Sequence, residues 1–174
     1  MRQAMDRRRR LFLAAILLCM FMLPACDQAG EGSFSWRLYG FETHRFTLGG
    51  EEISMRLDTS GSGRYEVDLR EDAICIMKDD RTIWEGGFLP AEEYAVLAEE
   101  ILASEDFRVI ERTGEDTPVF LLYCGNTGED PTYAFLSGIE DSGFGAIFSA
   151  PPGSIATEEE ARDYARRLKF VRSD

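Results

Sequence analysis

The chain has 174 residues, of which 19 are basic, 32 are acidic and one is a histidine, so its formal net charge is −13 at pH 7. Such an acidic chain repels the phosphates of nucleic acids and is not expected to bind them. Apolar residues make up 44% of the sequence, a content that excludes an intrinsically disordered chain. The negative charge itself has two interpretations, a basic protein partner or simply a soluble surface.

The first 25 residues have the three zones of an export signal. Five arginines form a basic start, residues 11–22 are almost wholly apolar, and Leu23-Pro24-Ala25 precede Cys26. A charged start, a short apolar run and a small residue before the cleavage point are typical of a signal peptide. A membrane-spanning helix needs about 20 apolar residues, so this run is short for one. An uncleaved N-terminal anchor helix is the alternative interpretation.

The stretch Leu23-Pro24-Ala25-Cys26 resembles the lipobox of bacterial lipoproteins, with leucine at −3 and a small residue at −1. Pro24 departs from the small or aliphatic residue usual at −2. The resemblance covers residues 1–26 and implies that residues 1–25 are cleaved and that Cys26 receives a palmitate-type diacylglyceryl group. It places the protein at the bacterial cell envelope, facing the periplasm or the exterior. Asp27 resembles the signal that retains enterobacterial lipoproteins in the inner membrane.

The remainder divides into a tether and a single domain. Residues 26–33 are the lipidated cysteine and a short flexible tether, which spans only roughly 15 Å as a coil. Residues 34–174 are long enough for one domain with a hydrophobic core. The leader holds five of the 19 basic and one of the 32 acidic residues, so the rest has 14 and 31, a formal balance of −17. The short tether is expected to keep the domain close to its membrane, while the negative charge of the domain is expected to make it stand away from an anionic membrane surface.

Short strands dominate the pattern. Expected strands are Arg45–Leu48, Ile53–Leu57, Tyr65–Leu69, Ala73–Met77, Thr82–Glu85, Phe107–Glu111, Val119–Cys124, Thr132–Leu136 and Phe144–Phe148. Turn residues separate them at residues 49–52, 59–63, 78–81 and 126–128, and Gly86-Gly87 is expected to end the strand that precedes it. This spacing predicts a meander of antiparallel strands.

Two helices complete the expected fold. The first opens at Pro90 and carries an apolar stripe at helical spacing, namely Tyr94, Leu97, Ala98, Ile101 and Leu102. The second opens with Thr157-Glu-Glu-Glu160, a capping box, and its stripe is Ala161, Tyr164, Ala165 and Leu168. We therefore predict an α+β domain, an antiparallel β-meander with two amphipathic helices packed on the sheet. The layout of residues 64–136 is similar to small bacterial domains that include emfourin-type protease inhibitors, which implies an inhibitor role. The acidic surface separately allows an inhibitor or immunity-type role against a basic enzyme.

Two groups of side chains have a structural and a functional interpretation. Cys75 and Cys124 lie in expected strands, and exported proteins meet oxidising conditions, so they are disulfide candidates; two separate buried thiols are the alternative. Phe34, Trp36, Tyr39, Phe41 and Phe46 crowd the start of the domain. Trp36, Tyr39 and Phe41 are candidates for partner binding if they are exposed. Buried, the same aromatic residues complete the core.

No motif in the sequence predicts a reaction. A zinc site would need the only histidine, His44, together with Cys75 and Cys124, without the spacing of known zinc sites. Asn126, Glu129 and Asp130 are oxygen ligands suited to calcium, although such residues also mark turns. We therefore expect no cofactor and no catalytic role, and predict a membrane-anchored, non-catalytic binding or accessory lipoprotein. The alternatives are a structural subunit of an envelope assembly and, ranking lower, a hydrolase that uses two carboxylates.

Overall fold

The computed structural model describes residues 35–38, 40–70, 73–114, 117, 119–124 and 132–173. Its strands are β1 (Ser35–Leu38), β2 (Phe41–Leu48), β3 (Glu51–Asp58), β4 (Tyr65–Leu69), β5 (Ile74–Lys78), β6 (Arg81–Pro90), β7 (Phe107–Thr113), β8 (Val119–Cys124), β9 (Thr132–Gly138), β10 (Phe144–Ser149) and β11 (Leu168–Ser173). Its helices are α2 (Ala91–Ala103) and α3 (Glu158–Arg166). The α+β class with two helices packed on antiparallel sheet is confirmed.

The strands form two antiparallel sheets. The four-stranded sheet has the order β1-β2-β3-β11, and the seven-stranded sheet has the order β4-β5-β6-β10-β9-β8-β7. Consecutive hairpins make most of each sheet, as a meander does. Two pairings join distant parts of the chain, because β10 pairs with β6 and the C-terminal β11 pairs with β3.

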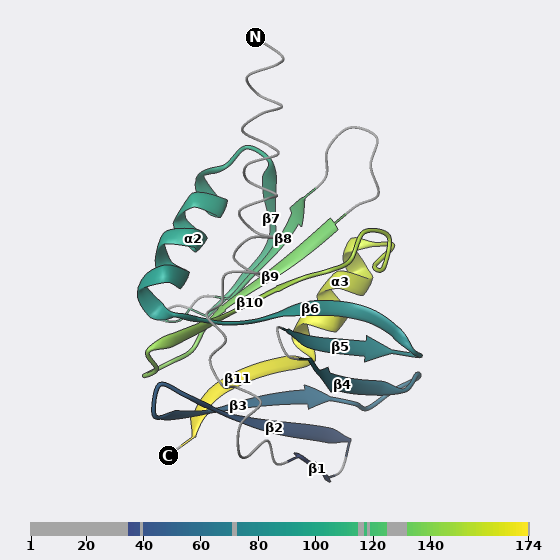
Figure 1. Cartoon of the computed structure of the whole chain (residues 1–174). Helices are drawn as coiled ribbons and strands as arrows, with labels where there is room; N and C mark the ends of the chain where they lie inside the picture. The colour runs from purple at the N-terminus through teal and green to yellow at the C-terminus, as the bar shows by residue number, and fades with distance from the viewer. Residues whose placement is uncertain are drawn as a thin grey trace.

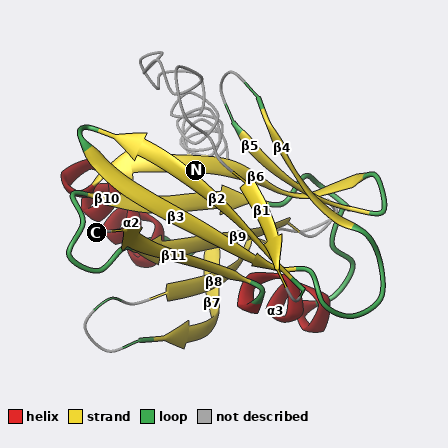
Figure 2. Cartoon of the chain, turned by 90° about the horizontal axis from the view of Figure 1, so that it is seen from below, coloured by secondary structure: helices red, strands yellow, loops and turns green. Residues whose placement is uncertain are grey.

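The elements stack in layers, as Figures 1 and 2 show from two directions. The main core lies between the two sheets and beneath α3, and it includes Met55, Trp84, Phe148 and Tyr164. A second cluster lies on the other face of the seven-stranded sheet, where Ala98 and Ile101 of α2 pack with strand residues such as Leu122. The helices therefore cover opposite faces of the seven-stranded sheet.

The predicted turns and the predicted cap have clear physical causes. Gly49 and Gly50 join β2 to β3 with φ of 56° and 87°, the left-handed backbone that a tight two-residue hairpin requires. Asp79 and Asp80 do the same between β5 and β6, with φ of 50° and 63°. At the start of α3, the amide of Glu160 donates to Thr157 Oγ1 at 3.2 Å, as the capping box predicts.

The sequence prediction was wrong in three details, and it also assigned no strand at Ser35–Leu38, where β1 lies. Gly86-Gly87 does not end a strand, because β6 continues to Pro90; a Cβ at Gly86 would lie 2.0 Å from the carbonyl oxygen of Ile147, so glycine allows β10 to approach. Leu102 was expected in the buried stripe of α2 but is 38% exposed. Leu168 was assigned to the second helix, but it begins β11, which the prediction missed.

The two disulfide candidates are not placed to form a disulfide in this fold. Cys75 lies on β5 and Cys124 on β8, with β6, β10 and β9 between them. Four strand spacings of about 4.8 Å place the two residues roughly 19 Å apart, far beyond the Cα separation that a disulfide allows. Cys75 is instead a fully buried thiol, and burial raises its pKa.

Candidate functional site

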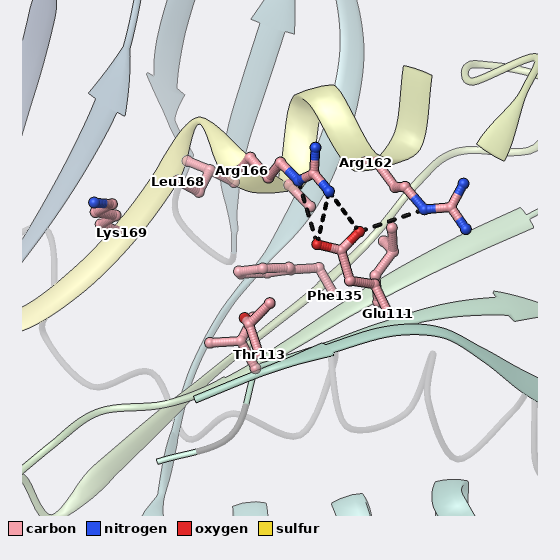
Figure 3. A pocket seen from close by; sticks show the side chains of 10 residues that line it. Glu111, Thr113, Phe135, Arg162, Arg166, Leu168 and Lys169 are labelled. Atoms are coloured by element: carbon pink, nitrogen blue, oxygen red, sulfur yellow. Dashed lines mark hydrogen bonds and ion pairs between the residues drawn. The ribbon is translucent and has the colours of Figure 1, made fainter. Parts of the chain in front are cut away.

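A cleft of about 230 Å³ opens between α3, β11 and the β7–β8 end of the seven-stranded sheet (Figure 3). Its floor is apolar and is formed by Val119, Leu121, Phe135, Ala165 and Leu168. Its polar lining residues are Glu111, Thr113, Arg162, Arg166 and Lys169. An apolar recess bordered by a few polar groups is the usual form of a binding site. The volume is below that of most small-molecule sites, so it suits a single side chain or a fragment of a larger ligand.

A β-bulge in the edge strand places Glu111 at this cleft. Val109 pairs with Leu122 and Glu111 pairs with Leu121, which leaves Ile110 as an extra residue in β7. Residues that alternate along a strand share one face, so Val109 and Glu111 would point the same way without the bulge. The extra residue turns Glu111 to the α3 side, as bulges commonly do.

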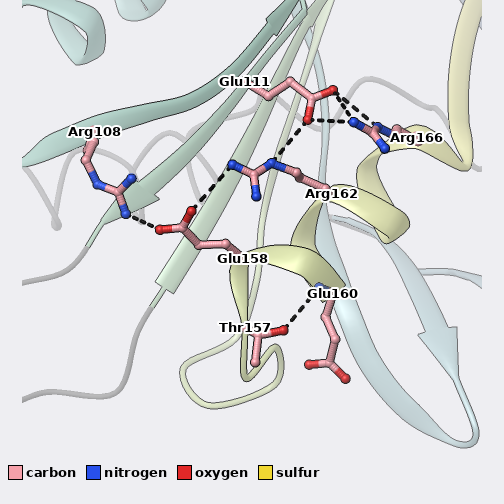
Figure 4. A network of polar contacts seen from close by, with 7 residues as sticks. All are labelled: Arg108, Glu111, Thr157, Glu158, Glu160, Arg162 and Arg166. Atoms are coloured by element: carbon pink, nitrogen blue, oxygen red, sulfur yellow. Dashed lines mark hydrogen bonds and ion pairs between the residues drawn. The ribbon is translucent and has the colours of Figure 1, made fainter.

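Glu111 is held by two arginines of α3. The guanidinium of Arg166 donates to both carboxylate oxygens of Glu111, through Nη2 at 3.1 Å, and Nε of Arg162 lies 3.4 Å from Oε2. Arg162 also faces Glu158 one helical turn earlier, and Glu158 is ion-paired with Arg108 of β7 (Figure 4). Charges of alternating sign therefore join the edge strand to the helix along one side of the cleft.

The border of the cleft is cationic overall. Three of its lining residues are basic, and Glu111 is the only carboxylate among the described residues that line it. This local balance is opposite to the charge of the whole chain. Lys169 is exposed and makes no ion pair among those found in the described part of the chain. It lies between the inward-facing Leu168 and Phe170, so its side chain points to the outer side of the four-stranded sheet at the edge of the cleft. The arrangement suits an apolar group attached to an anionic one.

Replacing Glu111 by glutamine should lower the free energy of unfolding by about 1 kcal/mol, the upper end for partly exposed ion pairs. The substitution keeps the size of the side chain but leaves Arg162 and Arg166 facing each other without the carboxylate between them. Urea unfolding at low and high ionic strength would measure the loss, which should shrink as salt screens the charges.

The matched control is Glu66→Gln, which removes the carboxylate of a single exposed ion pair with Arg64. We expect a smaller loss there, because only one arginine loses its partner. Equal losses in the two variants, or a loss at Glu111 that does not depend on salt, would contradict the view that the charges act as a connected chain.

Comparisons with known protein families, curated proteins and solved structures found no match. Function is therefore argued from the site itself. Among the described residues, no group of three or more histidine, cysteine, aspartate or glutamate side chains is placed to hold a metal ion. In the same part of the chain, no helix combines the length and the apolar character needed to cross a bilayer.

The candidates from the sequence lie apart from the cleft or beyond the described residues. Cys26, the tether, Tyr39 and the calcium candidates Asn126, Glu129 and Asp130 lie outside the part of the chain that the structure describes. Trp36 belongs to β1, where its Cα pairs with that of Thr43. Phe41 is 42% exposed, with the guanidinium of Arg56 above its ring at 5.7 Å. Of the aromatic residues at the start of the domain, Phe46 instead joins the core.

His44 lies in a buried polar pair with Glu42, and it belongs to a different sheet from Cys75 and Cys124. It is on β2, in the four-stranded sheet, and its Nε2 donates to Glu42 Oε1 at 2.9 Å. Burial lowers the pKa of His44, and the nearby carboxylate opposes only part of that effect. The imidazole is therefore neutral at neutral pH, and its role in this structure is a hydrogen bond inside the fold.

Sequence reasoning missed the residues that form the cleft. The spacing of Glu158, Arg162 and Arg166 at four-residue intervals was a usable signal, because such residues share one face of a helix. Glu111 gave no such signal, because its orientation depends on the bulge in β7, and no glycine or other turn residue indicates that bulge in the sequence. The pairing of β11 with β3 also had to be known before Lys169 could be placed beside α3.

Proposed function

We propose that this protein is a membrane-anchored lipoprotein of the bacterial envelope whose domain binds a partner protein without catalysing a reaction. The cleft beneath α3 is the observation that carries the proposal. Its apolar floor can accept a side chain of the partner, and its cationic border can pair with a carboxylate next to that side chain. The lipid on Cys26 holds this binding domain close to the bilayer, facing the periplasm or the exterior.

The charge of the chain supports a partner that is basic overall. Long-range attraction between an acidic and a basic surface speeds association, while the contact inside the cleft determines which partner stays bound. The two requirements are compatible, because one apolar residue beside one carboxylate fits the cleft whatever the charge of the surrounding surface. An inhibitor or immunity-type role against a basic enzyme is one form of this function.

Blocking the cleft should abolish binding of the partner. Thr113 is exposed at the cleft border, so Thr113→Trp should cover the recess without disturbing the core. The matched control is Val96→Trp on α2, which adds the same indole at a 58% exposed position on the other side of the seven-stranded sheet. Cross-linked pull-downs from native envelopes, followed by quantitative mass spectrometry, would compare the two variants with the unchanged protein.

We expect at least one partner that is reduced about tenfold or more by Thr113→Trp, about 1.4 kcal/mol of binding free energy, and retained by Val96→Trp. A partner that binds all three proteins equally would place the interface elsewhere. Hydrolytic turnover that is lost on substitution of Glu111 would favour the carboxylate hydrolase instead.

A structural subunit of an envelope assembly is the second candidate. Exposed Phe41 on β2 favours it, because a large exposed aromatic residue is well suited to a subunit contact. For that function, Phe41→Ala rather than Thr113→Trp should remove the cross-linked partners.

A further inference from the structure

The outer face of the four-stranded sheet is the side of this sheet that points away from the core. Side chains alternate along a strand, and Phe46, Met55 and Phe170 point inward to the core. The intervening residues therefore point outward, and we call this side the open face. Its members on β2, β3 and β11 are Phe41, Thr43, Arg45, Thr47, Glu52, Ser54, Arg56, Asp58, Lys169, Val171 and Ser173.

The open face combines exposed apolar side chains with basic ones. Phe41 and Val171 are 42% and 45% exposed. Arg56 on β3 lies directly opposite Lys169 on β11, an arrangement of like charges that destabilises a sheet unless an anion is near. Both described helices pack against the seven-stranded sheet, so neither covers this face (Figure 1).

Charge changes sign from one side of the domain to the other. The open face carries three basic residues, Arg45, Arg56 and Lys169, and two acidic ones, Glu52 and Asp58. Glu52 is already ion-paired with Arg45 at 3.3 Å. On the far side of the seven-stranded sheet, α2 carries four glutamates and no basic residue. The open face therefore has a formal charge of +1, whereas α2 has a formal charge of −4.

The proposed anchor precedes the four-stranded sheet in the sequence. Nine positions separate Cys26 from Ser35, the first residue of β1, which is the edge strand of the four-stranded sheet. As the coil that the sequence predicts, this segment reaches roughly 15–18 Å. The four-stranded sheet is thus the part of the domain that the anchor brings nearest to the bilayer.

We propose that the open face of the four-stranded sheet rests on the anionic lipid surface that holds the anchor, with α2 turned away from the membrane. The inference rests on the proposed lipid anchoring. Each basic residue near an anionic surface raises the equilibrium constant for contact about fivefold. This gain is too small to bind a free acidic protein. The anchor removes that limit, because it keeps the face at a high local concentration beside the headgroups. Repulsion between the anionic headgroups and the glutamates on α2 favours the same orientation.

A spin label on each side of the domain tests the orientation. The full lipidated protein, in a Cys124→Ser background, would carry a nitroxide at Thr47→Cys on the open face or at Glu99→Cys on α2, both exposed positions. The protein would be reconstituted on vesicles of phosphatidylcholine, with or without phosphatidylglycerol. Accessibility of each nitroxide to a water-soluble nickel complex, relative to oxygen, reports how close it lies to the bilayer.

On vesicles with phosphatidylglycerol, we expect the label at position 47 to be at least threefold less accessible to nickel than the label at position 99. The difference should shrink on phosphatidylcholine alone, and it should disappear in Arg45→Glu/Arg56→Glu. The control Arg81→Glu/Arg112→Glu makes the same change of charge at exposed positions of the seven-stranded sheet and should leave the difference in place.

The outcomes separate this inference from the proposed function. Equal accessibility at the two positions, or closer approach of α2, in a protein whose mass confirms the lipid would overturn the orientation alone. Loss of the difference in the control would show that net charge, not the open face, sets the orientation. A protein without the lipid would overturn both proposals.

Discussion

Replacing Phe170 by alanine should lower the free energy of unfolding by about 3–5 kcal/mol, the usual cost of deleting a buried phenyl ring. Phe170 lies on β11 of the four-stranded sheet and is 8% exposed. Its ring contacts three rings of the seven-stranded sheet, those of Phe88, Phe135 and Phe148, with centroid distances of 5.7, 6.1 and 5.6 Å. One side chain thus links the two sheets, and its removal leaves a cavity that neither sheet can fill alone.

The control is Phe41→Ala, on the same sheet but on its open face. Phe41 is 42% exposed, with the guanidinium of Arg56 above its ring, so its loss should cost about 1 kcal/mol or less. Urea unfolding followed by far-UV circular dichroism would compare the two variants. Similar losses would mean that the contact between the sheets does not depend on Phe170, and that the sheets are held together elsewhere.

The prediction from sequence was strongest where local chemistry decides the backbone. The glycine pair and the aspartate pair between alternating strands identified hairpins because few residues adopt left-handed backbone. Thr157 and Glu160 identified a helix start because they satisfy amides that the first turn leaves without partners. These signals act within about five residues, so they need no knowledge of the rest of the fold.

The prediction failed where distant parts of the chain decide the structure. Leu168 continues the apolar spacing of α3, so nothing local separates it from the helix; it joins β11 because β3 offers an edge for Phe170 and its neighbours to pair with. Cys75 and Cys124 both looked suited to a disulfide, since each lies in a strand. Only the order of strands within the sheet separates them.

The cleft combines both kinds of information. Its arginines are spaced as a local pattern, but the carboxylate between them comes from a strand about fifty residues earlier, turned inward by an extra residue. Binding sites usually combine residues that are far apart in the sequence, because the fold brings them together and no local sequence pattern connects them. The open face is similar, since its charge balance appears only when β11 is placed beside β3.

Replacing Cys26 by serine should release the protein from membranes. A thioether-linked diacylglyceryl group supplies two acyl chains, and two chains hold a protein on a bilayer where one gives only marginal binding. Serine keeps the size of the side chain but has no thiol to accept the lipid. Fractionation of cells, followed by a carbonate wash of the membranes and immunoblotting, should show the protein move from the membrane pellet to the soluble fraction.

The matched control is Cys124→Ser, which removes a thiol from the domain and should leave the protein in the pellet. Intact mass of the purified protein gives an independent check, because cleavage before Cys26 and acylation each change the mass by a defined amount. Unchanged partitioning of the serine variant, with a chain that still begins at Met1, would favour the uncleaved anchor helix. The proposed binding role of the cleft would be unaffected in that case, but the proposed orientation of the open face would have to be derived from that helix and not from a tether of roughly 15–18 Å.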